Sequence, residues 1–436
     1  MCSRRAKAYR NFIAFWILGL LNNFLWVVMN AGAGSINEAG IALVYLVNVV
    51  PSLTMKLTGP YWFHYVSYRC RMHIMAFLMV CCLCIVAWGD GNHIKLLGVA
   101  CCSVASGMGE ASILAMTSFY DAQSCLAAWS SGTGFAGIAG YLWSLAFDAI
   151  DTCFQVQLMV ALWIPVAWLL TFYCLLGVPW IDKERMPLDL RDAEPEELSH
   201  MDSETSVDDS EASSTSCHSA SEVATARLTF KERFFFILSL WPYTIPLLFV
   251  YVSEYAIQSG LWAAMGFPVT DPVSRRNWYK WSNFTYQVGV FISRTFFILI
   301  CRSRSVLWTG GFLQILMAIF FTFAAVHPFG GWWLLAPSLF VGFLGGGVYV
   351  GAFSLIAKEQ KSEYVELALC SASVADTIGM IFANVLGLMA QGCIFGMMKV
   401  LDTKPDFTCG YDIWDSYNRT IHTPVYAAHC FPGVQG

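Results

Sequence analysis

Three carboxylates of this 436-residue chain lie within apolar stretches: Glu110 in ASGMGE, Glu254 in VYVSEY and Asp376 in SVADTIGM. An ionisable side chain inside a lipid-spanning helix is costly, so it usually faces a cavity or a partner. A low dielectric disfavours the charged form of a carboxyl group, so such a group can carry a proton. We therefore expect these three acids to contact a solute or move a proton, or to form structural pairs with Lys56 or Arg294.

Lys56 and Arg294 are the candidate cations within or beside the apolar stretches. A guanidinium presents a planar fork of donors that matches the oxygens of a phosphate group. Arg294 is therefore a candidate for binding an anionic headgroup, and the alternative is that it extends to the cytosolic interface. Lys56 lies close to the end of its predicted helix, which favours a role as an interface anchor.

Uncharged polar side chains in the apolar stretches supply further donors and acceptors. The candidates are Asn22, Asn23, Ser131, Thr133, Tyr251, Gln258 and Gln287. They suit a hydroxyl-rich solute such as a glycerol derivative. Polar residues also join transmembrane helices without any ligand, and for each residue taken alone that reading is favoured.

The sequence gives no reason to expect an enzyme. It has no G-x-S-x-G segment, no H-E-x-x-H segment and no glycine-rich loop ending in Lys-Ser or Lys-Thr. Most of the 16 cysteines lie in apolar runs, where a thiol behaves as a small hydrophobic group. We expect no catalytic residue, no metal site and no cofactor. The formal charge of −5 comes largely from one acidic loop, so no nucleic-acid partner is expected.

The elements that carry these residues are predicted to be transmembrane helices. The chain is 57% hydrophobic and 13% charged, with a mean hydropathy of +0.56, whereas a soluble domain carries about 25% charged residues. Recurrent long apolar runs indicate an all-α polytopic membrane protein with about 11 transmembrane helices. The predicted helices are 11–31, 41–59, 73–89, 94–118, 125–147, 156–178, 240–265, 283–301, 305–326, 333–357 and 366–390. The stretch from Asp271 to Lys280 is expected to be a polar loop.

Four regions follow from this plan. Residues 1–181 form an N-terminal half of six helices, and residues 233–398 form a C-terminal half of five. Between them, residues 182–232 are rich in Ser, Asp and Glu and are predicted to be disordered and cytosolic. This loop is either a solvated linker or a contact for cytosolic trafficking partners. Residues 399–436 are a polar, aromatic tail. Two halves joined by a central loop are typical of the major facilitator superfamily.

Loop charge predicts the orientation in the membrane. With a cytosolic N-terminus, most of the 25 Lys and Arg residues fall on the cytosolic side. Eleven helices then place the tail in the lumen or outside the cell. Asn418, in an Asn-Arg-Thr sequon of that tail, is a candidate glycosylation site.

Several segments together resemble the battenin family of lysosomal and vacuolar membrane proteins. They include LGLLNNFLWVVM at 18–29, ASGMGE at 105–110, WSSGTGFAG at 129–137, VYVSEYAIQSGL at 250–261, YQVGVFISR at 286–294 and LGGGVYVGAF at 344–353. The resemblance implies a major-facilitator-like fold in a lysosomal, late endosomal or vacuolar membrane. It also implies a role in clearing glycerophosphodiesters from the lumen and in lysosomal pH and basic amino acid balance.

Three hypotheses about function follow. The favoured one is a secondary transporter that moves a small polar solute, with glycerophosphodiesters first, coupled to protons. The second is a transporter of basic amino acids or nucleosides, for which Glu110, Glu254 and Asp376 would supply acidic contacts. The third is a membrane protein that does not transport but recruits trafficking partners through residues 182–232.

Overall fold

The computed structural model describes residues 2–37, 40–62, 65–117, 120, 122–176, 230–296, 303–327, 330–361 and 364–398. All regular secondary structure in these ranges is helical, which confirms the predicted all-α class. Nearly all of the predicted 182–232 loop, the whole 399–436 tail and Asn418 lie outside the described residues.

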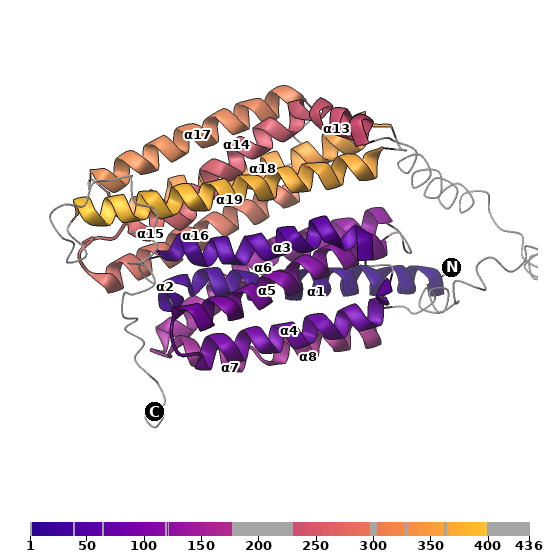
Figure 1. Ribbon diagram of the computed structural model, residues 1–436, viewed down its shortest axis with the longest axis horizontal. Coiled ribbons are helices and arrows are strands. Elements are labelled where there is room, and N and C mark those ends of the chain that lie inside the picture. Colours follow the sequence, from indigo (N-terminus) through magenta and orange to yellow (C-terminus); the bar gives the residue numbers. More distant parts are fainter. Residues whose placement is uncertain are drawn as a thin grey trace, which may run out of the picture.

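The N-terminal half contains the elements before the central loop. They are α1 (Cys2–Ala31), α2 (Ala33–Ile36), α3 (Ile41–Trp62), α4 (Tyr68–Trp88), α5 (Asn92–Met116), α6 (Ala122–Ala149), α7 (Phe154–Val160), α8 (Trp163–Leu170) and the wide π-helical turn η4 (Thr171–Leu175). The long helices run almost parallel to one another in a single bundle (Figure 1). Helix α1 packs along α6, and α4 packs along α5.

The C-terminal half forms a second bundle beside the first (Figure 1). Its elements are α13 (Phe230–Ser239), α14 (Trp241–Ala256), the π-helical turn η6 (Ile257–Leu261), α15 (Trp262–Ala264), α16 (Pro272–Phe296), α17 (Arg304–Val326), η8 (Trp332–Leu334), α18 (Leu335–Glu359) and α19 (Val365–Met397). Within it, α16 packs along α18 and α14 packs along α19. The halves meet where α6 lies against α16 and α3 lies against α19.

Eight of the described helices are long and apolar enough to cross a membrane. They belong to both halves, from Ala8–Ala31 at one end of the chain to Ser371–Met397 at the other. Helices α6, α14 and α16 run alongside these eight in the bundles (Figure 1). The predicted total of about 11 stays a prediction.

The expected loop at Asp271–Lys280 is wrong, because these residues form the first turns of α16. Asp271 caps the helix: its carboxylate oxygens accept hydrogen bonds from the backbone N–H groups of Val273 at 3.1 Å and Ser274 at 3.0 Å. Pro272 occupies the first helical position, where its missing N–H costs nothing. Helix α1 likewise begins at Cys2, before the predicted residue 11. In both places hydropathy marks the apolar part of a helix and not its polar start.

Glycines allow α1 and α6 to pack backbone against backbone. A Cβ atom at Gly19 would lie 2.7 Å from the Trp129 carbonyl oxygen, and one at Gly132 would overlap the Trp16 carbonyl oxygen. Small residues at helix contacts are a common means of transmembrane association. This close approach fixes the position of α6, which also forms the contact with the other half.

Gly132→Val is expected to destabilise the protein by forcing α1 and α6 apart. Overpacking of this kind costs about 1–3 kcal/mol. The measurement is the thermal unfolding midpoint of the purified protein in detergent, followed by size-exclusion fluorescence. Gly134→Ala on the same helix is the matched control, because its Cβ would meet the Arg294 Cδ at an ordinary 3.6 Å. Equal midpoints for the two variants would contradict the proposed packing role.

Glu359 joins three helices at the end of the bundle where α14 and α17 begin. Its carboxylate accepts hydrogen bonds from the Tyr243 hydroxyl at 2.6 Å and from the Arg304 Nε at 2.9 Å. The Tyr243 hydrogen bond, together with that from Arg304, holds the pKa of Glu359 below its ordinary value. The ionised carboxylate therefore stabilises the fold above its unfolded pKa, and this contribution is lost as the pH falls through the folded pKa.

We expect Glu359→Gln to lower the unfolding midpoint at pH 7, and we expect this difference to shrink as the pH falls through the lowered pKa of folded Glu359, where the wild-type carboxyl group is protonated too. The measurement is the unfolding midpoint of both proteins between pH 3.5 and pH 8. Lys358→Gln, an exposed neighbour, is the control and should show no such pH dependence. A difference between wild type and Glu359→Gln that stays constant with pH would argue against this effect.

Candidate functional site

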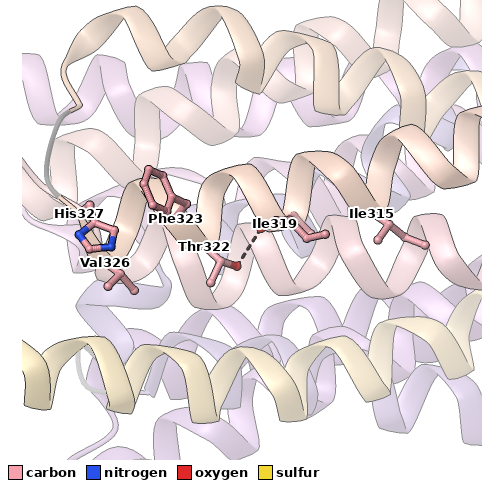
Figure 2. Close-up of a pocket in the computed structure, with 7 residues that line it drawn as sticks. Ile315, Ile319, Thr322, Phe323, Val326 and His327 are labelled. Atoms are coloured by element: carbon pink, nitrogen blue, oxygen red, sulfur yellow. Dashed lines mark hydrogen bonds between the residues drawn. The ribbon is translucent and has the colours of Figure 1, made fainter.

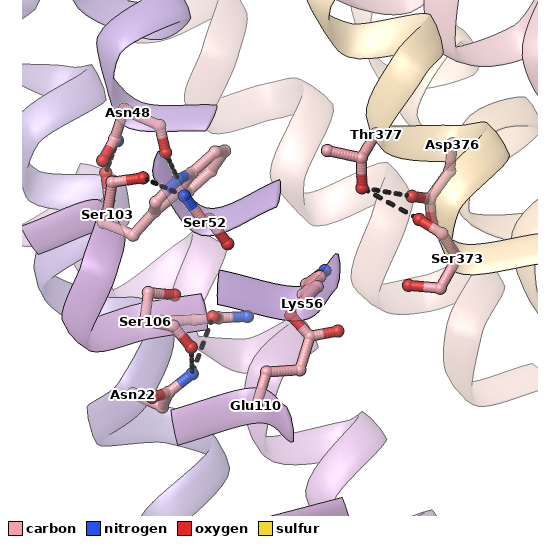
Figure 3. A network of polar contacts seen from close by, with 12 residues as sticks. Asn22, Asn48, Ser52, Lys56, Ser103, Ser106, Glu110, Ser373, Asp376 and Thr377 are labelled. Atoms are coloured by element: carbon pink, nitrogen blue, oxygen red, sulfur yellow. Dashed lines mark hydrogen bonds and ion pairs between the residues drawn. The ribbon is translucent and has the colours of Figure 1, made fainter. Parts of the chain in front are cut away.

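Lys56 and Glu110 form an ion pair in the N-terminal half. The Lys56 Nζ lies 2.9 Å from a Glu110 carboxylate oxygen, and the two side chains are 17% and 28% exposed. Lys56 comes from α3 and Glu110 from α5 (Figure 3). Lys56 thus has a carboxylate partner inside the bundle, as the structural-pair alternative predicts, and this partner is Glu110.

Asp376 faces this ion pair from the C-terminal half. It lies well inside α19, is 4% exposed and accepts a hydrogen bond from its neighbour Thr377 at 2.9 Å. Its carboxylate interacts electrostatically with Lys56 and with Glu110. Figure 3 shows Asp376 across the interface from Lys56. We call Lys56, Glu110 and Asp376 the lysine cluster.

Glu254 forms a second centre, entirely within the C-terminal half. It is 4% exposed on α14, and one carboxylate oxygen accepts a hydrogen bond from the Tyr286 hydroxyl. The other oxygen, Oε2, has no hydrogen-bond partner among the described residues and packs against Gly345 of α18. A side chain at position 345 would overlap this oxygen, so the glycine leaves room for the carboxylate.

Arg294 lies beside Glu254 near the end of α16. Its guanidinium lies over the Tyr349 ring, 4.7 Å from the ring centre, and its buried Nε has no hydrogen-bond partner in the part of the chain that the structure describes. The guanidinium interacts electrostatically with Glu254, but it forms no ion pair with any described carboxylate. A Cβ atom at Gly134 of α6 would lie 3.6 Å from its Cδ, so Arg294 lies at the interface between the halves. We call Glu254, Tyr286, Arg294 and Tyr349 the arginine centre.

Tyr349 connects the two groups of residues. Besides its contact with Arg294, it interacts electrostatically with Lys56, Glu110 and Asp376. Its ring packs edge to face on Tyr251, with ring centres 6.4 Å apart. Tyr349 was not among the candidates from sequence, although it follows the glycine run Gly345–Gly347 by two residues. The only signal was its position on that glycine-rich helix.

Some of the other predicted residues lie near the arginine centre or the interface between the halves, and the rest make contacts within one half. Tyr251 is buried and stacks on Tyr255, with ring centres 5.9 Å apart. Gln287 lies against Gly137 of α6, across the interface. Gln258 is buried in the π-helical turn η6, and its amide nitrogen has no partner.

The remaining four candidates make contacts within the N-terminal half. The Asn22 amide donates to the Ser106 carbonyl at 3.2 Å and to the Asn23 side chain at 3.4 Å (Figure 3). The Trp16 indole donates to the Ser131 hydroxyl at 3.3 Å. The Thr133 hydroxyl donates to the carbonyl of residue 130 at 2.9 Å. Each of these contacts is of the structural kind that the sequence favoured.

The two halves are joined at one end of the bundle, where α1 and α6 end and α16 begins. The hydroxyls of Tyr45 and Tyr279 lie 2.8 Å apart, and the Tyr279 hydroxyl donates to the Asn30 carbonyl at 2.6 Å. The Lys280 Nζ donates to an Asp148 carboxylate oxygen, also at 2.6 Å. Hydrogen bonds between described residues of different halves all lie here. We call this the sealed end.

A shallow apolar groove on α17 lies apart from both groups. It is lined by Ile315, Ala318, Ile319, Thr322, Phe323, Val326 and His327, all from one helix or its end (Figure 2). Ile319 and Phe323 are more than half exposed, as expected of a lipid-facing surface. Within the described ranges, no group of three or more His, Cys, Asp or Glu residues could hold a metal ion.

The fold and the buried ionisable residues define a class: a multi-pass helical membrane protein with a major-facilitator-like fold in two halves. The family model described as CLN3 protein matches residues 13–396. The chain therefore belongs to the CLN3 protein family, which confirms the resemblance to the battenin family.

Relatives in other organisms agree with this assignment, and a solved structure shares the fold. The protein btn-1 of Neurospora crassa is 32% identical over 420 residues, covering 87% of each chain. Battenin of Canis lupus familiaris is 29% identical over 422 residues, covering 88% of this chain and 91% of its own. A bacterial homologue of the human lysosomal transporter Spinster, in an inward-facing and occupied conformation, matches with a TM-score of 0.50 and 12% identity. That match covers 89% of this chain and 80% of the solved one, and it shows the fold.

Proposed function

We propose that this protein is a secondary transporter that moves glycerophosphodiesters out of the lumen of a lysosome or vacuole and thereby supports the pH balance of that compartment. The observation that carries the proposal is Arg294, a guanidinium at the interface of the halves that forms no ion pair with a carboxylate of the described residues. A phosphodiester is a permanent anion, and its oxygens match the donor fork of an arginine. Major-facilitator substrates bind between the two halves.

The lysine cluster shows why Arg294, and not Lys56, is proposed to bind the anion. Lys56 already has Glu110 as its ion-pair partner and Asp376 nearby, so its charge is compensated. Arg294 is therefore the cation with donors available for an anionic ligand. Tyr251 and Gln287 lie within reach of the same interface and suit the hydroxyl groups of a glycerol moiety.

Two disulfide-bonded cysteines support a cytosolic N-terminus and a luminal position of the sealed end. Cys153, which precedes α7 near Asp148, and Cys393, close to the end of α19, are both disulfide-bonded. Disulfides form in oxidising compartments and are rare in the cytosol. The start of α7 and the end of α19 lie at the end of the bundle opposite the start of α1 (Figure 1). This orientation makes the sealed end luminal, so a solute at the interface would leave toward the cytosol.

Purified protein reconstituted into liposomes, with labelled glycerophosphoglycerol or glycerophosphocholine, tests the proposal. Protein-dependent flux is expected, and Arg294→Ala should lower it at least tenfold. Arg10→Ala is the control for loss of an arginine, because Arg10 is exposed near the start of α1. Flux of a different solute, with none of either phosphodiester at any pH gradient, would refute the substrate class.

Two other functions are distinguished by simple additions to the same system. Three carboxylates near the interface favour a cationic solute, so inhibition of flux by free arginine or lysine would indicate a basic amino acid transporter. A protein that only recruits trafficking partners should lose its cellular effect when residues 182–232 are deleted. A transporter with the same deletion should keep its flux in liposomes.

A further inference from the structure

We propose that Glu254 and the transported anion compete for Arg294, so that one proton and one anion are bound and carried together. This inference rests on the proposed function and adds the coupling ion and the residue that carries it. It starts from the arginine centre, where the one described carboxylate beside the unpaired guanidinium is itself only half satisfied. The Tyr286 hydroxyl donates a hydrogen bond to one oxygen of Glu254, and Oε2 has no partner among the residues that the structure describes.

The positions of these groups are fixed by three helices. Tyr286 of α16 holds the Glu254 carboxylate from one side, and Gly345 of α18 leaves the space for Oε2. Tyr349 of α18 holds the Arg294 guanidinium through its ring. Glu254 and Arg294 therefore interact through space without forming an ion pair. An anion on Arg294 would be placed close to the Glu254 carboxylate.

Charge then couples the two binding events. When Glu254 is ionised, its negative charge offsets part of the attraction of Arg294 for an anion and repels the anion directly. When Glu254 is protonated, Arg294 keeps its full charge and the neutral carboxyl group can donate a hydrogen bond. A buried pair of like charges is strongly disfavoured at low dielectric. The anion and the proton therefore bind together, and their charges sum to zero for a singly charged phosphodiester.

The surrounding groups point to Glu254 as the proton carrier. Its own helix presents Tyr251 and Tyr255, α16 presents Tyr286 and Arg294, and α18 presents Tyr349. From the elements packed beyond these come Tyr45 of α3 and Asp376 of α19. Free phenols titrate near pH 10, far from physiological pH. Asp376 has Lys56 as a compensating cation. Glu254 is thus the carboxyl group whose protonation changes the field at Arg294 most directly.

An acidic lumen gives this coupling a direction. Protons bind Glu254 on the luminal side, the anion binds with them, and both are released where the pH is higher. The chemistry is a proton–anion symport that needs no other ion. Because the loaded site is neutral for a singly charged phosphodiester, its transport should not respond to membrane potential.

The test uses the full-length protein in liposomes that contain a pH-sensitive dye, with labelled glycerophosphoglycerol as the anion. For wild type, a lower pH outside the liposomes than inside should drive accumulation of the anion, and one proton should enter with each anion. Glu254→Gln should lower gradient-driven accumulation at least tenfold and should retain exchange of labelled for unlabelled anion. A potential set by potassium and valinomycin should change neither result.

A binding measurement tests the coupling of proton and anion even if a variant transports poorly. Affinity of the detergent-purified protein for glycerophosphoglycerol, measured by calorimetry, should fall at least tenfold between pH 5 and pH 7.5 in wild type. In Glu254→Gln this pH dependence should disappear, whereas Asp376→Asn should keep it. Proton-driven accumulation in Glu254→Gln, or equal pH dependence of its binding, would overturn the coupling. Absence of both flux and binding in wild type would instead overturn the proposed substrate class.

Discussion

Lys56→Met is expected to abolish solute flux, because it leaves Glu110 and Asp376 facing each other with no cation between the halves. Lys56 pairs with Glu110 at 2.9 Å and interacts with Asp376 from the opposite half. Removing one partner of a buried ion pair costs about 3–5 kcal/mol. The pair is 17% and 28% exposed, so water screens it and the cost in stability is smaller than that. The larger effect is expected on transport, because repulsion between Glu110 and Asp376 would hinder α3 and α19 from approaching each other.

A second substitution separates stability from transport in this case. The double variant Lys56→Met with Glu110→Gln removes one of the two unpaired carboxylates. Its unfolding midpoint should return most of the way to the wild-type value. Its flux should stay at least a hundredfold below wild type, because the halves no longer share a cation. Lys358→Met, at the exposed end of α18, is the control for loss of a lysine as such. Wild-type flux in the double variant would show that Lys56 is only a structural partner of Glu110.

Asp148→Asn is expected to open the sealed end, because it leaves the Lys280 ammonium without its carboxylate. The Lys280 side chain is 3% exposed and the Asp148 side chain is 30% exposed. The Lys280 Nζ lies 2.6 Å from the Asp148 Oδ2. An uncompensated buried charge is strongly destabilising, and each 1.4 kcal/mol changes a conformational equilibrium about tenfold. We therefore expect the population with separated halves to rise at least tenfold.

Hydrogen–deuterium exchange of the first turns of α16 and the last turns of α6 measures this opening. Both segments should exchange faster in Asp148→Asn than in wild type, and the double variant Asp148→Leu with Lys280→Met should restore slow exchange. Asp151→Asn is a matched control: Asp151 is exposed, and its φ of 49° is one that asparagine also tolerates. Unchanged exchange in Asp148→Asn would show that the tyrosine contacts alone hold this end closed.

Hydropathy was sufficient to predict the class of fold, since apolar runs long enough to cross a bilayer are a direct consequence of its thickness. It was insufficient at the polar starts of helices. The turns from Asp271 to Lys280 contain four charged residues and were assigned to a loop, although Asp-Pro is a common helix start. This error hid Lys280, one of the residues that join the halves.

The ionisable residues of the candidate site were identified from sequence because a charge in an apolar run is rare and therefore conspicuous. The sequence offered Lys56 as a structural partner for one of the three acids, but it did not say which one, since Lys56 and Glu110 are separated by most of two helices. Three tyrosines were missed for a different reason, whereas Tyr251 was among the candidates. Tyr45, Tyr279 and Tyr349 read as ordinary aromatic residues of membrane helices, and only the packing shows that their hydroxyls or rings join separate helices.

The π-helical turn Ile257–Leu261 directly follows the helix that carries Glu254. A turn of this kind contains one residue more than an α-helical turn needs. Moving that surplus residue along the helix rotates the segment it passes by about 100°, because an α-helix has 3.6 residues per turn. At this turn Gly260 packs directly on Gly387 of α19, where a Cβ atom would lie 2.5 Å from the Gly387 Cα, so a rotation that brought another residue to this contact would require α19 to move. A rotation of the segment that carries Glu254 would therefore be coupled to a movement of α19, the helix that carries Asp376.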